Sequence, residues 1–111
     1  MAPAHEIPEI SPAALKELLD SPQPPLVLDV REKWELDAAR LQGTLDIPMP
    51  QIPQRLAELP RDRDIVVMCH GGTRSMKVAR FLAQNGFTQV ASLDGGIQAW
   101  ATDVDPSVGT Y

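Results

Sequence analysis

Short segments rich in apolar residues alternate with amphipathic stretches along this chain, and this alternation constrains its fold more than any other feature. Segments 7–10, 26–30, 45–47, 65–68 and 89–93 have the length and residue types of strands. Between them, residues 11–20 and 75–84 repeat apolar side chains at the spacing of an α-helix. Strands that alternate with helices are typical of an α/β fold with a largely parallel sheet, so we predict that fold class.

The chain is long enough for one domain with a hydrophobic core. It has 111 residues, of which 43% are hydrophobic and 23% charged, close to the composition of ordinary globular domains. We predict a single domain over residues 5–102. Residues 103–111 carry Asp, Pro, Ser and Gly, and we expect them to form a loosely held C-terminal tail.

The charge balance argues against several classes of partner. Fifteen acidic residues against ten basic ones give a net charge of -5, which disfavours binding to a phosphate backbone. No apolar run approaches the roughly 20 residues that span a bilayer. The first residues also lack the basic and apolar regions of a secretory signal. We therefore expect no nucleic acid and no membrane as a partner, and a cytoplasmic location.

One cysteine, Cys69, and two histidines, His5 and His70, limit the redox and metal chemistry of the chain. A single cysteine forms no internal disulfide, and these three residues make a poor zinc site. We expect no metal and no organic cofactor.

Residues 65–75 combine a strand, a glycine-containing loop and the start of a helix. Cys69 follows the predicted strand at its carboxyl end, where parallel sheets bind ligands. Gly71 and Gly72 allow the loop to curl its N–H groups inward, and the following helix adds its own free N–H groups. Such a cradle favours a thiolate or a persulfide anion at Cys69.

The distribution of charge supports an anion site at this loop. No acidic residue occurs from Ile65 to Leu93, although the whole chain is acidic. Arg74 lies where the helix begins, and its guanidinium can offer two hydrogen bonds to a sulfonate or a phosphate-like group.

Several of these residues also have structural interpretations. A lone cysteine after an apolar strand is often a buried small hydrophobic residue, although the glycines and the cationic helix start make this alternative less favoured for Cys69. His70 is as well explained by an exposed loop position as by a catalytic role. Arg80 is assigned to the solvated face of the helix, and Trp34 and Trp100 are predicted to pack against the core.

Three ordered motifs make the chain resemble the rhodanese-like family over about residues 7–100. The motifs are Leu28-Asp29-Val30-Arg31-Glu32 with Trp34-Glu35, the loop from Cys69 to Ser75, and Leu93-Asp94-Gly95-Gly96-Ile97-Gln98-Ala99-Trp100. The resemblance implies a three-layer fold with an open, mostly parallel five-stranded sheet flanked by helices. One position departs from the pattern, because Ala39-Arg40-Leu41 stands where the family usually has Gly-His-Ile.

The resemblance also implies a reaction and the residues that carry it. Cys69 would accept sulfane sulfur as a persulfide, and the donor would be thiosulfate or a similar anion. The acceptor would be cyanide or a thiol, with a protein acceptor as a further expected partner. Asp29 and Arg31 would support the site or the fold near the strand end. The substrate-binding loop would consist of His70, Gly71, Gly72, Thr73, Arg74 and Ser75.

Loop length separates this reaction from phosphoryl transfer. Four residues, His70 to Thr73, separate Cys69 from Arg74, whereas cysteine-dependent phosphatases place one residue more between cysteine and arginine. The smaller cradle suits one added sulfur atom. Two alternatives stay open: a sulfur-relay or binding module that uses the same persulfide, and, less favoured, a phosphatase or arsenate reductase of the same fold. For the reductase, the chain lacks a second, resolving cysteine.

Overall fold

Five short strands form one sheet, in the order β1-β5-β4-β2-β3, in the computed structural model, which describes residues 6–111. The strands are β1 (Glu9–Ile10), β2 (Leu26–Asp29), β3 (Leu45–Asp46), β4 (Ile65–Met68) and β5 (Val90–Leu93). Every pairing is parallel. The predicted α/β class and five-stranded sheet are therefore confirmed. The predicted start of the domain at residue 5, together with His5, lies outside the described residues.

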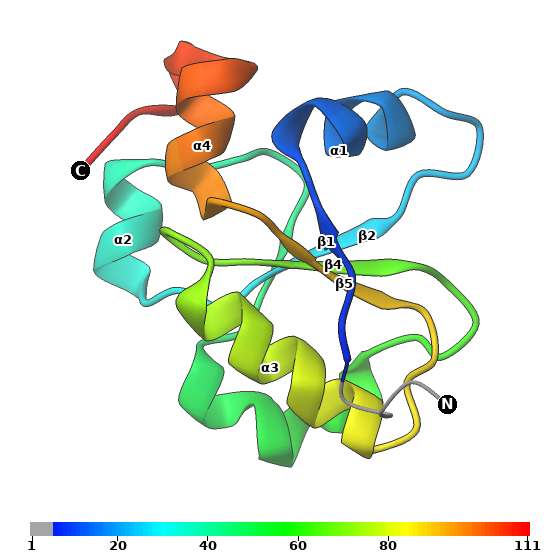
Figure 1. Cartoon of the computed structure of the whole chain (residues 1–111). Coiled ribbons are helices and arrows are strands. Elements are labelled where there is room, and N and C mark those ends of the chain that lie inside the picture. The colour runs from blue at the N-terminus through cyan, green and yellow to red at the C-terminus, as the bar shows by residue number, and fades with distance from the viewer. Residues whose placement is uncertain (1–5) are drawn as a thin grey trace.

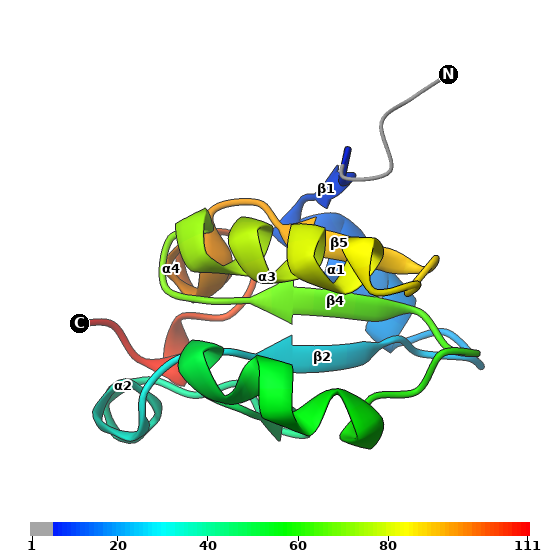
Figure 2. The ribbon, with the colours of Figure 1, turned by 90° about the horizontal axis from the view of Figure 1, so that it is seen from below.

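The register of the central strands places the residues that follow them at one edge of the sheet. Asp29 at the end of β2 is opposite Met68 at the end of β4, and Val67 is opposite Ser92 of β5. Cys69 therefore leaves β4 next to the segment that follows β2. In Figure 2 the arrows of β2 and β4 point to the side where α2 and the C-terminal end lie.

Helices cover both faces of the sheet (Figure 1). Helices α1 (Pro12–Leu19) and α4 (Gly96–Asp103) lie on one face, and α3 (Thr73–Gln84) and the 3₁₀ helix η1 (Met49–Glu58) lie on the other. Successive strand residues feed the two cores alternately: Val67 packs under α3, whereas Val66 and Met68 pack under α1 and α4. Helix α2 (Lys33–Ala38) follows β2 at the carboxyl edge of the sheet.

Local sequence explains where these helices begin and bend. The Ser11 hydroxyl accepts a hydrogen bond from the Ala14 N–H at 3.1 Å, with Pro12 in the first turn of α1. The η1 segment is a 3₁₀ helix with a kink at Arg55, two residues after Pro53.

The two tryptophans differ in their surroundings. Trp100 is buried as predicted, at 3% exposure. The prediction for Trp34 is wrong, because this side chain is 65% exposed. Helix α2 turns Glu35 inward instead, where the carboxylate has charged and polar partners.

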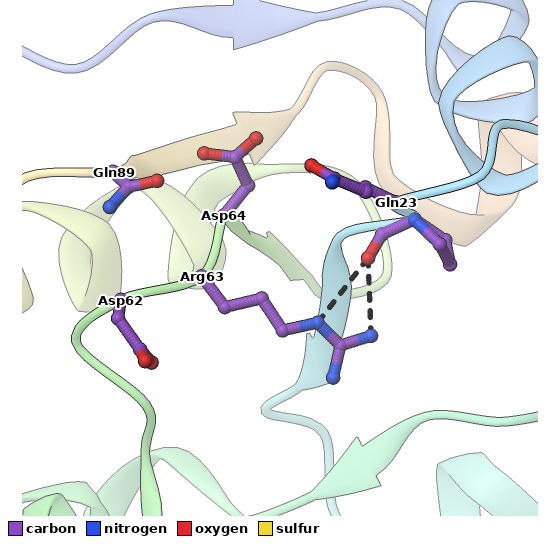
Figure 3. A pocket seen from close by; sticks show the side chains of 6 residues that line it. Gln23, Asp62, Arg63, Asp64 and Gln89 are labelled. Carbon is purple, nitrogen blue, oxygen red and sulfur yellow. Dashed lines mark hydrogen bonds between the residues drawn. The ribbon is translucent and has the colours of Figure 1, made fainter.

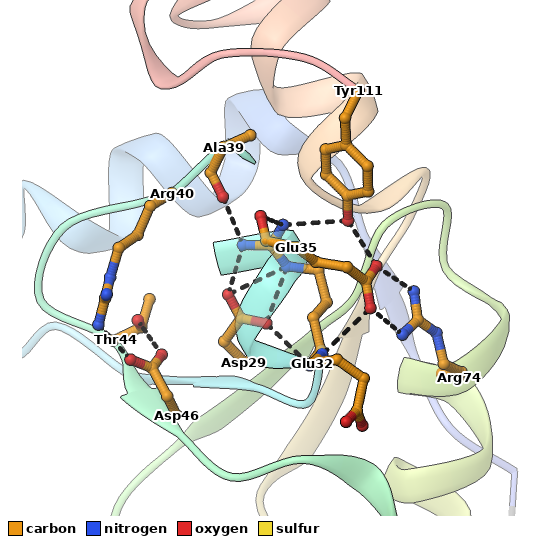
Figure 4. Close-up of polar contacts among 10 residues, drawn as sticks. Asp29, Glu32, Glu35, Ala39, Arg40, Thr44, Asp46, Arg74 and Tyr111 are labelled. Atoms are coloured by element: carbon orange, nitrogen blue, oxygen red, sulfur yellow. Dashed lines mark hydrogen bonds and ion pairs between the residues drawn. The ribbon is translucent and has the colours of Figure 1, made fainter. Parts of the chain in front are cut away.

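Residues 103–111, expected as a loosely held tail, make defined contacts in the structure. Asp103 ends α4, and a short 3₁₀ helix, η2 (Pro106–Val108), packs against α4. The backbone carbonyl of Val108 accepts a hydrogen bond from the Arg40 N–H at 3.0 Å. The chain then runs back to the carboxyl edge of the sheet, where Tyr111 lies beside Glu35 (Figure 4).

Among residues 6–111, no helix combines the length and the apolar character needed to cross a membrane.

Candidate functional site

The sulfur of Cys69 is enclosed by the first turn of α3. Sγ accepts a hydrogen bond from the Gly72 N–H at 3.1 Å and another from the Ser75 N–H at 3.3 Å, and Cys69 is only 1% exposed. Gly72 has a φ of 110°, a conformation open to glycine but strained for other residues, and it is the N-cap of the helix. Two N–H donors and the positive end of α3 therefore meet at the sulfur, an arrangement that stabilises negative charge there.

Two buried hydroxyls extend this cradle behind the sulfur. The Cys69 thiol lies 3.5 Å from the Ser75 hydroxyl, which donates to the Gly72 carbonyl at 3.0 Å. The Ser75 and Ser92 oxygens are 2.8 Å apart, and both residues are fully buried. Ser92 was given no role from the sequence, although a serine within an apolar strand is a signal that could have drawn attention to it.

The first turn of α4 holds the loop from its other side. The Ile97 N–H donates to the Cys69 carbonyl at 2.9 Å, and the Gln98 N–H donates to the His70 carbonyl at 3.1 Å. A Cβ atom on Gly96 would lie 2.3 Å from the His70 carbonyl oxygen and 2.5 Å from that of Cys69. Glycine at position 96 is therefore required for the helix to approach the loop this closely.

Arg74 forms a two-pronged ion pair with Glu35 of α2 (Figure 4). The distances are 2.7 Å from Nη1 to Oε1 and 2.8 Å from Nη2 to Oε2. The hydrogen bonds from Arg74, and then from the Tyr111 hydroxyl and the Glu32 N–H, lower the pKa of Glu35 to about 2 although burial opposes this. The bond to Glu35 in turn raises the pKa of Arg74. The guanidinium that was expected to face a donor anion therefore already has a carboxylate partner.

Asp29 and Arg31 form a second ion pair, which is completely buried under the site. Arg31 Nε and Nη2 donate to the Asp29 carboxylate at 3.0 and 2.9 Å. The remaining N–H groups of Arg31 donate to the carbonyls of Glu35 and Ala39 and to the Tyr111 hydroxyl. Every donor of this guanidinium thus has an acceptor, which compensates for its burial.

Residues 39–41, which depart from the rhodanese-like pattern, contribute to the structure around the site. The Ala39 carbonyl accepts the bond from Arg31 at 2.8 Å, and Leu41 is buried in the core beneath α1 and α4. Arg40 is exposed and forms an ion pair with Asp46. The replacement therefore leaves the buried support of the site intact.

Tyr111 connects several parts of the site. Its ring stacks on the ring of His70, with centroids 4.1 Å apart and planes 19° apart. Its hydroxyl donates to Glu35 Oε2 at 2.6 Å and accepts from Arg31 Nη1 at 3.0 Å. Neither Tyr111 nor Glu35 was assigned a site role from the sequence, because no short motif reports contacts between residues this far apart in the chain.

The structure brings the predicted loop together around one centre. Gly72 and Ser75 contact the sulfur directly, whereas His70 and Arg74 lie at the edge with Tyr111 and Glu35. Gly71 and Thr73 are exposed. Within the described residues, no group of three or more His, Cys, Asp or Glu side chains is placed to hold a metal ion.

A cavity of about 480 Å³ lies away from Cys69, at the amino ends of the strands (Figure 3). Arg63 crosses part of it and donates to the Pro24 carbonyl at 3.3 and 3.2 Å. Parallel sheets bind ligands at the opposite edge, where Cys69 lies, so we do not assign the site to this cavity. Its lining residues are Gln23, Pro24, Asp62, Arg63, Asp64 and Gln89.

Comparison with known proteins gives consistent matches. A family model described as the rhodanese-like domain matches residues 11–103. A protein named sulfurtransferase from Allochromatium vinosum is 38% identical over 93 residues, which cover 84% of this chain and 87% of that protein. The crystal structure of a rhodanese-related protein from Thermoplasma volcanium is 32% identical, with a TM-score of 0.80, and the match covers 87% of this chain and 93% of that one.

A third match is a longer protein. The putative sulfur carrier protein YrkF of Bacillus subtilis is 37% identical over 97 residues, which cover 87% of this chain and 52% of that protein. This chain therefore spans about half the length of that relative. The region matched by the family model contains Cys69 and the residues around it, but it ends before Tyr111.

Proposed function

This chain belongs to the rhodanese-like family of sulfurtransferases and sulfur carriers, and from that premise we propose that it transfers sulfane sulfur through a persulfide on Cys69. The observation that carries this proposal is the position of Sγ, which accepts two backbone N–H hydrogen bonds at the start of α3. These donors are fixed by the fold before any substrate arrives. They can therefore stabilise a thiolate and a persulfide anion without rearrangement.

The first half-reaction is a displacement at sulfur. The Cys69 thiolate attacks the outer sulfur of thiosulfate, and an S–S bond forms between Sγ and that atom. The S–S bond within thiosulfate breaks, and sulfite leaves with the electron pair. Arg74 lies at the start of the same helix, and we propose that its guanidinium orients the sulfonate end of the donor.

The second half-reaction returns the cysteine to its starting state. A nucleophilic acceptor, cyanide in an assay or a thiol, attacks the terminal sulfur of the persulfide. The acceptor–sulfur bond forms as the persulfide S–S bond breaks, and the electron pair returns to Cys69 as thiolate. The Gly72 and Ser75 N–H groups donate to Sγ in the structure, and we propose that they stabilise the thiolate before the first half-reaction and after the second.

A sulfur-relay role is a second candidate function. It is favoured by the likeness to a putative sulfur carrier protein, and it uses the same Cys69 persulfide. The difference lies in the acceptor, which would be a thiol of another protein.

Mass spectrometry of the intact protein tests the persulfide directly. Incubation with thiosulfate should add the mass of one sulfur atom, and cyanide or dithiothreitol should remove it. Because Cys69 is the single cysteine, protein alkylated beforehand serves as a matched control that should gain no sulfur. Cys69→Ser should lose both the adduct and thiocyanate formation while it keeps the circular dichroism of the wild type. Turnover that persists in this variant would contradict the mechanism.

A further inference from the structure

Tyr111 reaches the catalytic loop from a segment that follows α4 and η2. Its side chain contacts four residues around the site: it hydrogen-bonds Arg31 and Glu35, stacks on His70 and meets the edge of Trp34 at a centroid distance of 5.7 Å. Two of these, Glu35 and Arg31, are almost or completely buried, whereas Tyr111 itself is 37% exposed. A half-exposed side chain with this many polar and aromatic contacts contributes less to the hydrophobic core than to the arrangement of its neighbours.

The hydroxyl of Tyr111 lies between the two ion pairs of the site. It accepts from Arg31 Nη1 at 3.0 Å and donates to Glu35 Oε2 at 2.6 Å. The same Oε2 atom accepts from Arg74 Nη2 at 2.8 Å. A continuous line of hydrogen bonds therefore runs from the fixed Arg31 to the Arg74 guanidinium.

The protonation state of Tyr111 allows its hydroxyl to donate a hydrogen bond to Glu35. Burial raises the pKa of Tyr111 above its ordinary value, and donation to Glu35 raises it further, while the bond from Arg31 works against this rise. The phenol therefore keeps its proton at neutral pH and acts as a donor to Glu35. Arg31 supplies the opposing bond that fixes the direction of the hydroxyl.

The ring of Tyr111 acts on a second part of the loop. It stacks on His70, the residue that follows the nucleophile, at a centroid distance of 4.1 Å. The His70 carbonyl is held separately by the Gln98 N–H. The backbone of His70 is thus fixed by α4, and its ring is fixed by Tyr111.

We propose that Tyr111 is a positioning residue for sulfur transfer, which fixes the Arg74 guanidinium through Glu35 and the His70 ring by stacking. Its part in sulfur transfer rests on the function proposed above, whereas its hold on Arg74 and His70 does not. Tyr111 touches neither the sulfur nor any group that changes bonds, so it acts through those two side chains. Loss of the hydroxyl should therefore weaken the use of an anionic donor while the reactivity of Cys69 changes little.

Two substitutions separate the hydroxyl from the ring. Tyr111→Phe keeps the stacked ring and removes both hydrogen bonds, and Tyr111→Leu removes the ring as well. For Tyr111→Phe we expect KM for thiosulfate to rise about threefold to tenfold with kcat within about twofold, less than for direct loss of a charged hydrogen bond to the donor, because Tyr111 acts on Arg74 only through Glu35. Alkylation of Cys69 by neutral iodoacetamide should change less than twofold, which is about 0.4 kcal/mol or less. Thr110→Ala, at the exposed neighbouring residue, is the matched control and should behave as the wild type.

Nuclear magnetic resonance gives a readout that does not depend on activity. In the wild type, the ring current of Tyr111 should shift the His70 imidazole protons upfield, and the Arg74 Nε–H should exchange slowly. Tyr111→Phe should keep the His70 shift and speed the Arg74 exchange, and Tyr111→Leu should lose both features. Unchanged Arg74 exchange together with an unchanged KM in Tyr111→Phe would overturn the positioning role. If the wild type forms no persulfide but these NMR changes occur, the proposed function fails and the hold of Tyr111 on Arg74 and His70 is upheld.

Discussion

Arg74 and Glu35 meet as a two-pronged ion pair although they come from different helices, with both N–O distances below 2.9 Å. The Glu35 side chain is 4% exposed and that of Arg74 is 30% exposed, so the carboxylate is the buried partner. Each Glu35 oxygen has a further donor, the Glu32 N–H on Oε1 and the Tyr111 hydroxyl on Oε2. The carboxylate therefore holds the guanidinium beside the cysteine loop and compensates part of its charge.

The low pKa of Glu35 predicts how stability depends on pH. A carboxyl group whose pKa is depressed to about 2 in the folded state stabilises the protein above its unfolded pKa, and this contribution is lost as the pH falls toward about 2. Because Arg74 is partly exposed, we expect a contribution of roughly 2 kcal/mol at pH 7. Urea unfolding of the wild type and Glu35→Gln should show this difference at pH 7 and a smaller one at pH 3. A difference that is equal at both pH values would contradict the assignment of this pair.

The role of Arg74 toward the donor is best measured in a background without Glu35. Removing Arg74 alone would leave a buried carboxylate unpaired, which costs several kcal/mol of stability and obscures the kinetics. Relative to Glu35→Gln, the double variant Glu35→Gln/Arg74→Ala should raise KM for thiosulfate about 10-fold to 100-fold, the equivalent of a lost charged hydrogen bond. Alkylation of Cys69 by iodoacetamide, which is neutral, is the comparison reaction and should change much less. Equal losses in both reactions would mean that Arg74 acts on the thiolate and not on the donor.

Gly96 should be intolerant of a side chain. An added Cβ would lie 2.3 Å from the His70 carbonyl oxygen, and the φ of 61° is itself unfavourable for alanine. We expect Gly96→Ala to lower the free energy of unfolding by about 3 kcal/mol and to reduce persulfide formation, because α4 must move away from the loop. Gly71→Ala is a matched control for stability, since its Cβ would meet nothing within 4 Å. Comparable unfolding free energies for the two variants would show that the close approach of α4 is dispensable.

Loop length should decide between sulfur and phosphoryl transfer. The wild type should transfer sulfur from thiosulfate and show negligible hydrolysis of p-nitrophenyl phosphate. Insertion of one glycine between Gly72 and Thr73 moves the two N–H donors of Sγ out of their present spacing. That variant should lose most of its sulfur transfer, and its hydrolysis of p-nitrophenyl phosphate is to be measured in parallel. A wild-type protein that hydrolyses the phosphate and forms no persulfide would contradict the assignment made from loop length.

The positions of the core strands and of the cysteine loop follow from local sequence signals. Apolar runs marked β2, β4 and β5, and the glycines beside Cys69 indicated a cradle at the start of a helix. The strands and the helix after Cys69 could be predicted because strand burial and helix starts depend on residues close together in the chain. The same reasoning placed Cys69 at the carboxyl edge of the sheet, where the structure has it.

The polar surroundings of the loop were harder to predict, because they depend on residues distant in sequence. Glu35 and Tyr111 are 76 positions apart, and Glu35 and Arg74 are 39 apart. Helix α2 is also too short for its apolar spacing to show which side faces inward, so Trp34 was assigned to the core and Glu35 was not. Only the tertiary fold shows that a carboxylate satisfies the loop arginine.

The hold of α4 on the loop has a consequence for a chain that is still being synthesised. Ile97 and Gln98 bind the carbonyls of Cys69 and His70, yet the ribosome adds them only after α3 and β5 have been made. A nascent chain that has exposed Cys69 but not α4 lacks these two hydrogen bonds, even when β5 is already available to pair with β4. The thiol consequently gains its full set of supports only when the domain folds as a unit. The loop around Cys69 therefore reaches its final geometry only after residues 97 and 98 have been added.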